Sequence, residues 1–222
     1  MSAALAQPAL PSKTWYSPEE YLAFDNAAEG RFEYMDGRIM PVGQPNAVNV
    51  LDPTFRAGAS PSHYELSRVL SGLLFNRLPR SCRAYTSDAR VHIPITGAYT
   101  YPDVVIVCGK PEYHDPDATL PSLLNPKVIM EILSDSTADY DRIGKFMRYR
   151  STASLKEYVL IDSRNMAVEL FTRQEAGGWG YTPANAPDDV LVLSSVGCTL
   201  SLGELYAGIL GEPGPLGAPN AS

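Results

Sequence analysis

The sequence predicts one domain of mixed α and β structure, and three stretches support that prediction. Apolar residues recur at helical spacing between residues 62 and 78. Residues 127–133 form the continuous apolar run of a buried strand, which Glu131 interrupts. The next stretch, residues 138–150, is predicted to be a helix that carries Arg142, Lys145 and Arg148 at three-residue steps, which would place three cations along one side. Helices that alternate with strands in one chain are typical of α/β proteins.

The composition is that of an ordinary globular protein. The 222 residues are 45% hydrophobic and 19% charged, which fits one domain with a substantial core. The N-terminus lacks the basic region and apolar run of a signal peptide, and no apolar stretch reaches the length of a membrane span. We therefore expect a cytoplasmic protein with no membrane partner. The net charge of −7 argues against general coating of nucleic acid, so a nucleic-acid substrate would require a local basic patch or a metal.

The chain has three cysteines, Cys82, Cys108 and Cys198. They are far apart, form no Cys-x-x-Cys motif and have no nearby histidine pair, so no zinc site is predicted. We expect reduced thiols that pack as small hydrophobic residues, as in cytosolic proteins.

A short helix is predicted near the N-terminus, after residues 1–13, which are small and polar and expected to be flexible. Ser17 is the predicted cap, Pro18 occupies the first helical position, and Glu20 completes a capping box. The helix should end near Ala27.

A hairpin and a long loop are predicted next. Residues 31–40 alternate around Asp36-Gly37, a pair that tolerates the positive φ of a tight turn. Residues 41–60 show no period and contain turn-forming residues throughout, which predicts a loop that is either a flap or an insertion without function.

The helix predicted from residue 62 ends before Pro79, and a β meander should follow. Its parts are a strand at 83–95, a turn at 97–100, a strand at 101–108 and a loop at 109–126. After the basic helix, further strands are predicted at 155–162, 166–173, 179–182 and 190–193, with a last short helix at 202–209. The tail at 211–222 is rich in Pro and Gly and should be disordered, which leaves 14–210 as one domain.

Two acids beside predicted strands are candidate metal ligands. Asp103 opens the strand at 101–108, and Glu131 interrupts the next buried strand. A buried carboxylate must be paired, protonated or bound to a metal. Two carboxylates on one sheet edge could hold Mg²⁺ or Mn²⁺, which prefer oxygen ligands and keep several waters. Lys145 on the following helix could then stabilise the attacking water or the charge on the reacting phosphate.

Each of these residues also has a structural explanation. Asp103 could be a turn residue after Pro102. Glu131 could form a buried ion pair with Lys145 or Arg142. Since ion pairs and metal sites use the same residue types, neither acid alone is diagnostic.

Two further residues are candidates for the same site. Glu33, in the predicted hairpin, could supply a third carboxylate or form a salt bridge with Arg31 or Arg38. His63, at the start of the long helix, could face the site or lie on the surface. A glycosidase that used Asp103 and Glu131 as acid and base would leave the adjoining basic helix unexplained.

Five runs of residues carry a family resemblance: Phe32–Ile39, Tyr101–Gly109, Asn125–Thr137, Tyr140–Phe146 and Leu155–Asp162. Together they resemble the Uma-two family of predicted endonucleases, within the PD-(D/E)XK restriction-endonuclease-like superfamily. The resemblance extends from Ser17 to Tyr206, with all motifs in order.

The resemblance implies a restriction-endonuclease-like core, with a central mixed β-sheet flanked by helices, an N-terminal helix and hairpin, and extra C-terminal strands. Asp103 and Glu131 take the places of the two motif acids, with the backbone carbonyl of Ile132 as a further metal ligand. The lysine expected two residues after Glu131 is Leu133 here, so the resemblance assigns its role to Lys145 on the helix. The loop at 43–60 is longer than is typical, and Asp135 replaces the usual proline.

The leading hypothesis is a metal-dependent endonuclease that hydrolyses phosphodiester bonds of DNA, with Mg²⁺ or Mn²⁺ as its cofactor. The alternative is a catalytically silent binding or assembly protein with a nuclease fold, built as a homodimer through the C-terminal strands. The net charge and the missing strand lysine favour that alternative.

Overall fold

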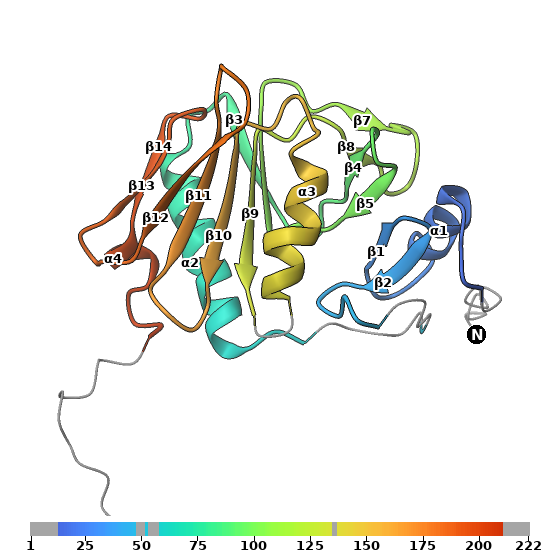
Figure 1. Ribbon diagram of the computed structural model, residues 1–222, viewed down its shortest axis with the longest axis horizontal. Coiled ribbons are helices and arrows are strands. Elements are labelled where there is room, and N and C mark those ends of the chain that lie inside the picture. Colours follow the sequence, from blue (N-terminus) through green and yellow to red (C-terminus); the bar gives the residue numbers. More distant parts are fainter. Residues whose placement is uncertain (1–12, 48–51, 53–57, 135–136, 211–222) are drawn as a thin grey trace, which may run out of the picture.

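The computed structural model describes residues 13–47, 52, 58–134 and 137–210, whose strands form two six-stranded sheets and one separate hairpin (Figure 1). The segments expected to be flexible, residues 1–12 and 211–222, lie outside the described residues, as does most of the centre of the predicted loop. Among the residues that the structure describes, no helix combines the length and the apolar character that crossing a membrane requires.

The main sheet is mixed, as predicted. Its strands, in spatial order, are β12 (Trp179–Ala184), β11 (Val168–Arg173), β10 (Glu157–Asp162), β9 (Val128–Leu133), β6 (Val104–Cys108) and β3 (Cys82–Thr86). Strands β9 and β10 are parallel, and the other neighbours are antiparallel. The central strands are buried on both faces, which explains their continuous apolar sequences.

Helices cover the two faces of this sheet (Figure 1). They are α2 (Pro61–Arg77) on one face, and η1 (Tyr140–Lys145) with α3 (Phe146–Tyr149) on the other. Met130 and Ile132 belong to the core cluster on the α2 side, whereas Leu133 packs in the cluster that contains Tyr149 of α3. Because side chains alternate along a strand, Glu131 points toward α3. The helix predicted at 138–150 therefore lies over Glu131.

A second sheet packs beside the first. Its strands, in spatial order, are β2 (Arg38–Pro41), β1 (Phe32–Met35), β5 (Ala98–Thr100), β4 (Val91–Ile93), β8 (Ser122–Leu123) and β7 (Tyr113–His114). Helix α1 (Pro18–Asp25) begins with the predicted capping box of Ser17 and Glu20. Asp36 and Gly37 adopt φ values of 51° and 77°, which confirms the predicted hairpin turn.

The single strand predicted at 83–95 is wrong. Strand β3 ends at Thr86, and a turn follows in which the Ala89 N–H donates to the Thr86 carbonyl (2.9 Å). The chain then enters β4 in the second sheet. Apolar and polar residues continue to alternate across this turn in the sequence, and the local signals against one strand were Ser87-Asp88 and Pro94.

Smaller differences occur elsewhere. The turn predicted at 97–100 lies earlier, since the Gly97 N–H donates to the Ile93 carbonyl (2.9 Å), and β5 follows it. Strands β7 and β8 lie within the predicted loop at 109–126. The remaining elements are β13 (Val190–Leu193), the unpredicted β14 (Cys198–Ser201) and α4 (Leu202–Leu205), which is shorter than predicted.

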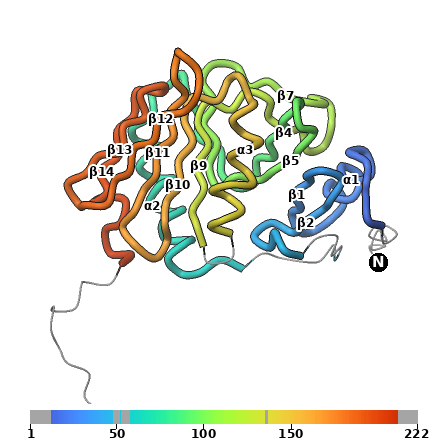
Figure 2. The backbone as a smooth tube through the Cα atoms, viewed as in Figure 1, coloured from blue at the N-terminus to red at the C-terminus, as the bar shows by residue number. Residues whose placement is uncertain are grey.

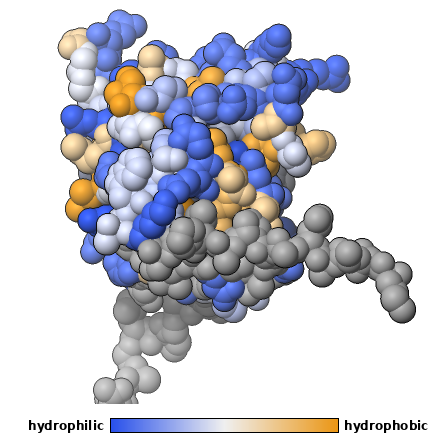
Figure 3. Space-filling view, turned by 90° about the vertical axis from the view of Figure 1, so that its right-hand side faces the viewer, coloured by the Kyte–Doolittle hydropathy of each residue, from blue (hydrophilic) through white to orange (hydrophobic). Residues whose placement is uncertain are grey.

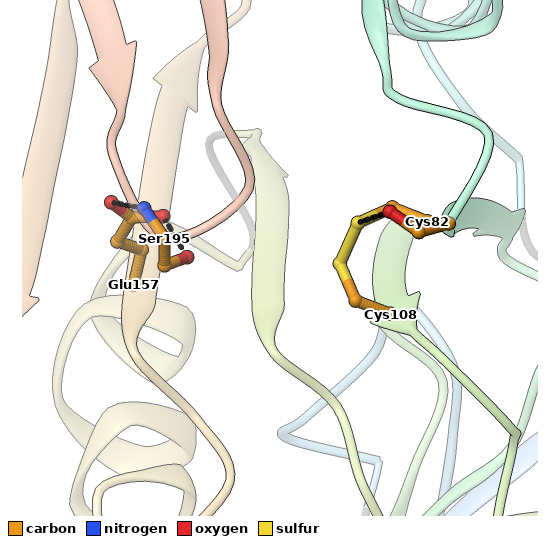
Figure 4. The surroundings of a disulfide bond; sticks show 5 residues. Cys82, Cys108, Glu157 and Ser195 are labelled. Carbon is orange, nitrogen blue, oxygen red and sulfur yellow. Dashed lines mark hydrogen bonds between the residues drawn. A yellow bond between two sulfur atoms is a disulfide. The ribbon is translucent and has the colours of Figure 1, made fainter.

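The prediction of three reduced thiols is wrong for two of them, because Cys82 and Cys108 form a disulfide (Figure 4). The two residues are direct partners in the antiparallel pairing of β3 with β6. They are separated by 26 residues in the chain, so only the strand pairing reveals their proximity. Cys198 is a buried free thiol, as expected.

Two partly buried hydrogen bonds also fix the C-terminal hairpin. The Ser195 hydroxyl and N–H, in the turn between β13 and β14, donate to Glu157 at 2.6 and 3.2 Å (Figure 4). Figure 2 shows this hairpin and helix α1 at opposite ends of the molecule. On the face beside α1, hydrophilic residues predominate and hydrophobic ones form small groups (Figure 3).

A buried ion pair fixes helix α1 to the second sheet. The Arg90 guanidinium lies 2.7 Å from the Asp25 carboxylate, and both side chains are almost fully buried. Arg90 also donates to the Ser122 hydroxyl (2.8 Å), and the Phe32 N–H donates to Asp25 (2.9 Å). These bonds fix the position of β1, which carries Glu33.

We predict that Arg90→Met strongly destabilises the protein, because it leaves the Asp25 carboxylate buried without a cation. Loss of one partner of a buried pair costs about 3 to 5 kcal/mol, which corresponds to a fall in melting temperature of roughly 6 to 20 °C. Thermal unfolding measures the change. Arg68→Met, which removes an exposed partner of Glu65, is the control and should change stability little. Equal melting temperatures for the two variants would contradict the structural role of Arg90.

Candidate active site

Asp103 and Glu131 lie side by side at one edge of the main sheet. Val104 of β6 pairs with Met130 of β9 in antiparallel register. Asp103 precedes Val104 and Glu131 follows Met130, so this register places the two acids opposite each other. The Asp103 N–H donates to Glu131 Oε2 at 3.3 Å, and the Ile132 N–H donates to Asp103 Oδ2 at 2.7 Å. The structure therefore brings these two sequence-predicted residues together.

The Lys145 ammonium reaches this edge from the helix above it. Its Nζ lies 3.2 Å from Glu131 Oε1, 3.1 Å from Glu33 Oε1 and 3.1 Å from Asp141 Oδ1. The Lys145 side chain is 7% exposed. Leu133, at the position where the motif lysine is expected, lies in the apolar core on the same face. Lys145 on the helix thus contacts Glu131, the acid beside which the motif would place a lysine on the strand.

Asp141 was missed by the sequence analysis. It is buried, and it precedes Lys145 by four residues, which is one helical turn and a spacing that allows an ion pair. That spacing was the available signal. Burial raises the pKa of the Asp141 carboxyl, while the Lys145 charge opposes the change.

This cluster holds more negative than positive charge. Burial alone would lower the pKa of the Lys145 ammonium, but the carboxylates of Asp141, Glu131 and Glu33 hold that pKa well above its usual value. Burial raises the pKa of Glu131 well above its usual value; the charge of Lys145 opposes this change, and the charges of Asp141, Asp103 and Glu33 add to it. One ammonium group cannot neutralise three buried carboxylates, so the cluster favours a proton or a second cation.

Hydrogen bonds orient the acids. The Tyr140 hydroxyl and the Tyr101 N–H each donate to Glu33 at 3.0 Å. The Tyr149 hydroxyl lies 3.2 Å from Glu131 Oε1 and 2.8 Å from the Thr100 hydroxyl. The described residues pair Glu33 with Lys145, not with Arg31 or Arg38 as one alternative predicted.

His63 contacts the site from the first turn of α2. Its Nε2 lies 3.5 Å from Asp103 Oδ2, and the side chain is 20% exposed. Ser60 caps the helix by accepting the His63 N–H at 3.2 Å. Burial alone would lower the pKa of His63, but the hydrogen bond to Asp103 and the negative charges of Asp103 and Asp141 together raise it.

The predicted row of three cations along one side of the basic helix is wrong. Arg142 pairs with Glu169 on β11, and Arg148 pairs with Asp36 in the first hairpin. Successive three-residue steps on an α-helix drift by about 60° around the axis, and the π-helical geometry of η1 changes the spacing further. Among these three cations, Lys145 alone contacts the acids.

The site borders a cavity of about 470 Å³. Its wall includes the cluster residues Glu33, His63, Asp103, Glu131, Asp141 and Lys145. Residues 42–43 and 58–60, which flank the undescribed centre of the predicted loop, line the same cavity. A ligand that entered it would contact both the acids and the ends of this loop.

The donor set fits a hard divalent cation. Within the described ranges, no group of three or more His, Cys, Asp and Glu side chains has the arrangement of a complete metal site. Mg²⁺ commonly uses one or two protein carboxylates and completes its coordination with water and substrate phosphate. The adjacent carboxylates of Asp103 and Glu131, in a cavity with excess negative charge, meet that requirement.

We predict that Glu131→Gln changes the pH dependence of stability in metal-free buffer. The folded protein binds a proton at Glu131 more tightly than the unfolded chain does, because its pKa is raised from 4.5. The wild type should therefore lose stability relative to the variant as pH rises above about 4.5, by at most about 1.4 kcal/mol per pH unit. Chemical denaturation of both proteins across pH measures this difference. A difference that grew in favour of the wild type with rising pH would show that attraction to Lys145 prevails.

Comparisons with known proteins agree with this fold and sequence pattern. The Uma2 family model, described as "putative restriction endonuclease", matches residues 18–203. An uncharacterized Synechocystis protein is 32% identical over 194 residues, which cover 87% of this chain and 92% of that protein. A second uncharacterized Synechocystis protein is 32% identical over 164 residues, or 73% of this chain and 84% of that protein.

A solved structure shares the fold. The crystal structure of a putative nuclease belonging to DUF820, from Anabaena variabilis, aligns with a TM-score of 0.63 and 19% identity, over 87% of this chain and 98% of that one. The predicted restriction-endonuclease-like fold and family resemblance are confirmed. The chain belongs to the Uma2 family of restriction-endonuclease-like proteins.

Proposed function

We propose that the protein is a metal-dependent endonuclease that hydrolyses phosphodiester bonds of DNA. The observation that carries the proposal is the adjacency of Asp103 and Glu131 on a cavity wall, with the buried Lys145 ammonium 3.2 Å from Glu131. The description of the matching family supports nuclease activity. Asp103 and Glu131 are the proposed ligands of Mg²⁺ or Mn²⁺. A third proposed ligand is the backbone carbonyl of Ile132, a residue that also lines the cavity.

When bound, the metal ion supplies positive charge to the phosphate and lowers the pKa of a water molecule. Lys145 supplies a second, fixed positive charge to the reacting phosphate. Its pKa is raised by the carboxylates around it, so it stays protonated near neutral pH and acts as a point charge, not as a general base. Glu33 and Asp141 hold the ammonium in place, and His63 steadies Asp103.

The charge of the cavity supports the proposed metal dependence. Among the residues that the structure describes, the carboxylates of Glu33, Asp103, Glu131 and Asp141 line it. A phosphate group would be repelled by this surface unless a divalent cation reduced its negative charge. Metal and substrate should therefore bind cooperatively.

The alternative function is a catalytically silent binding protein with the same fold. Two observations favour it: Leu133 replaces the motif lysine, and Glu131 already forms an ion pair with Lys145. In that protein the charged cluster would be a structural element.

We predict that Asp103→Asn and Glu131→Gln each abolish Mg²⁺- or Mn²⁺-dependent cleavage of plasmid and single-stranded DNA, because each removes ligand charge without changing volume. The same variants test metal binding without a substrate. If the dissociation constant is near ~1 mM, ~10 mM Mg²⁺ stabilises the wild type by about 1.4 kcal/mol and raises its melting temperature by roughly 3 to 6 °C. Both variants should lose most of this rise. If neither the wild type nor the two variants are stabilised by Mg²⁺ or Mn²⁺, the result favours the catalytically silent binding protein.

We predict that Lys145→Met lowers turnover by about 10²- to 10³-fold, since an aligned charge in the transition state is worth a few kcal/mol. Metal affinity should be retained, because the variant removes a competing cation. Turnover under single-turnover conditions and metal titration by calorimetry separate the two effects. Arg148→Met, on the same helix but paired with the exposed Asp36, is the control. Loss of metal binding in Lys145→Met, with its fold intact, would contradict the proposed role.

A further inference from the structure

A second cavity lies between α2 and the edge strand β3, on the side of the sheet away from Lys145. It measures about 610 Å³ and has an apolar wall that includes Leu74, Phe75, Leu78 and Ala84. The Phe75 side chain is 87% exposed, the largest exposed fraction among the large hydrophobic residues that the structure describes. An exposed phenylalanine beside an apolar groove indicates a surface that a partner covers.

The backbone of β3 has an open edge. The Gly109 N–H donates to the Ser81 carbonyl at 2.7 Å, which sets the alternation of hydrogen bonds between β3 and β6. Arg83 and Tyr85 consequently bond to β6. Three residues direct their backbone groups to the open edge: Cys82, Ala84 and Thr86.

Some of these groups already have partners inside the molecule. The Cys82 N–H donates to the Pro79 carbonyl at 2.8 Å, and the Thr86 carbonyl accepts the Ala89 N–H. Within the described residues, the backbone groups at the open edge that remain available for pairing are the carbonyl of Cys82, the N–H of Thr86, and the N–H and carbonyl of Ala84.

We propose that β3 pairs antiparallel with β3 of a second copy of the chain, about a two-fold axis at Ala84. The two Ala84 residues then exchange both of their hydrogen bonds. Cys82 lies opposite the partner's Thr86, so its remaining carbonyl meets a remaining N–H. The Cys82 N–H and the partner's Thr86 carbonyl, which are each bonded within their own chain, also face each other. The edge is thus complementary to itself, which is the requirement for a two-fold interface.

Side chains and charges match in the same register. Arg83 lies opposite the partner's Tyr85, where a cation and an aromatic ring attract each other. Antiparallel pairing also brings the start of β3, with the exposed Arg80, near the opposite end of the partner strand, where Asp88 is 71% exposed and pairs with Arg31 of its own chain. Arg80 would therefore lie near this exposed ion pair at each end of the seam.

The apolar groove is covered by the same arrangement. A two-fold axis perpendicular to the sheet keeps both α2 helices on one face of the joined sheet. The two grooves between α2 and β3 then merge along the seam, and both Phe75 side chains point into an enclosed apolar space. The pairing thus accounts for the exposed ring and the open strand together.

The opposite edge of the sheet is less suited to pairing. Bonding of the Gln174 N–H to the Gly178 carbonyl sets the alternation there, so Tyr181 and Pro183 of β12 face outward. Proline offers no N–H, and an outward-facing proline is a common protection of edge strands. Strand β3 has no outward-facing proline, which favours β3 over β12 as the dimer interface of this sheet.

Sedimentation equilibrium of the full chain, over a wide concentration range, tests the proposal. The wild type should be a dimer. Ala84→Pro removes the outward N–H but no bond to β6, and it should weaken dimerisation by at least about tenfold. Phe75→Glu changes an exposed position and should have a similar effect. Tyr181→Pro makes the same backbone change at the other edge and should leave the dimer intact.

Thermal melting shows whether each variant is folded. If Ala84→Pro does not fold, the oligomeric state of Phe75→Glu tests the interface instead. A wild type that is monomeric at every concentration overturns the proposal. So does a dimer that survives both Ala84→Pro and Phe75→Glu, or that dissociates only in Tyr181→Pro. This test is independent of nuclease activity.

Discussion

A single buried ammonium group, that of Lys145, joins the separate parts of this protein. It contacts Glu33 of the second sheet, Glu131 of the main sheet and Asp141 of its own helix, each at 3.1 to 3.2 Å. The two sheets and the helix are therefore connected through one charge. Removal of that charge would leave three carboxylates in a poorly solvated space, which is more costly than the loss of any one contact.

The position of this group depends on two structural features below it. Alternation along β9 sends Glu131 to the α3 face and Ile132 to the α2 face, so one strand serves both the site and the core. The buried pair of Asp25 and Arg90 holds α1 against the second sheet and thereby fixes β1, with Glu33, at the edge of the cavity. Packing and ion pairing in the second sheet are thus part of the geometry of the site.

The sequence was informative where the signal is local or where a charge interrupts an apolar run. The acids Asp103 and Glu131 stood out because their positions in apolar strands required an explanation, and the structure places them side by side. Asp141 did not stand out, because an acid in an amphipathic helix is usually solvent-exposed. The Cys82–Cys108 disulfide and the division of residues 83–95 between two sheets depend on which strands pair, and strand pairing between distant segments leaves no local pattern.

The charge balance of the site favours a functional explanation over a purely structural one. A structural ion pair needs one carboxylate for one ammonium group, and a hydrophobic replacement is often as stable. Here three carboxylates surround Lys145, a fourth, from Asp103, lies beside them, and burial raises the pKa of Glu131. Such a cluster is expected to lower the stability of the protein unless it binds a proton or a cation. Residues that cost stability in a cavity are expected where binding or catalysis requires them, and the proposed divalent cation would relieve this excess charge.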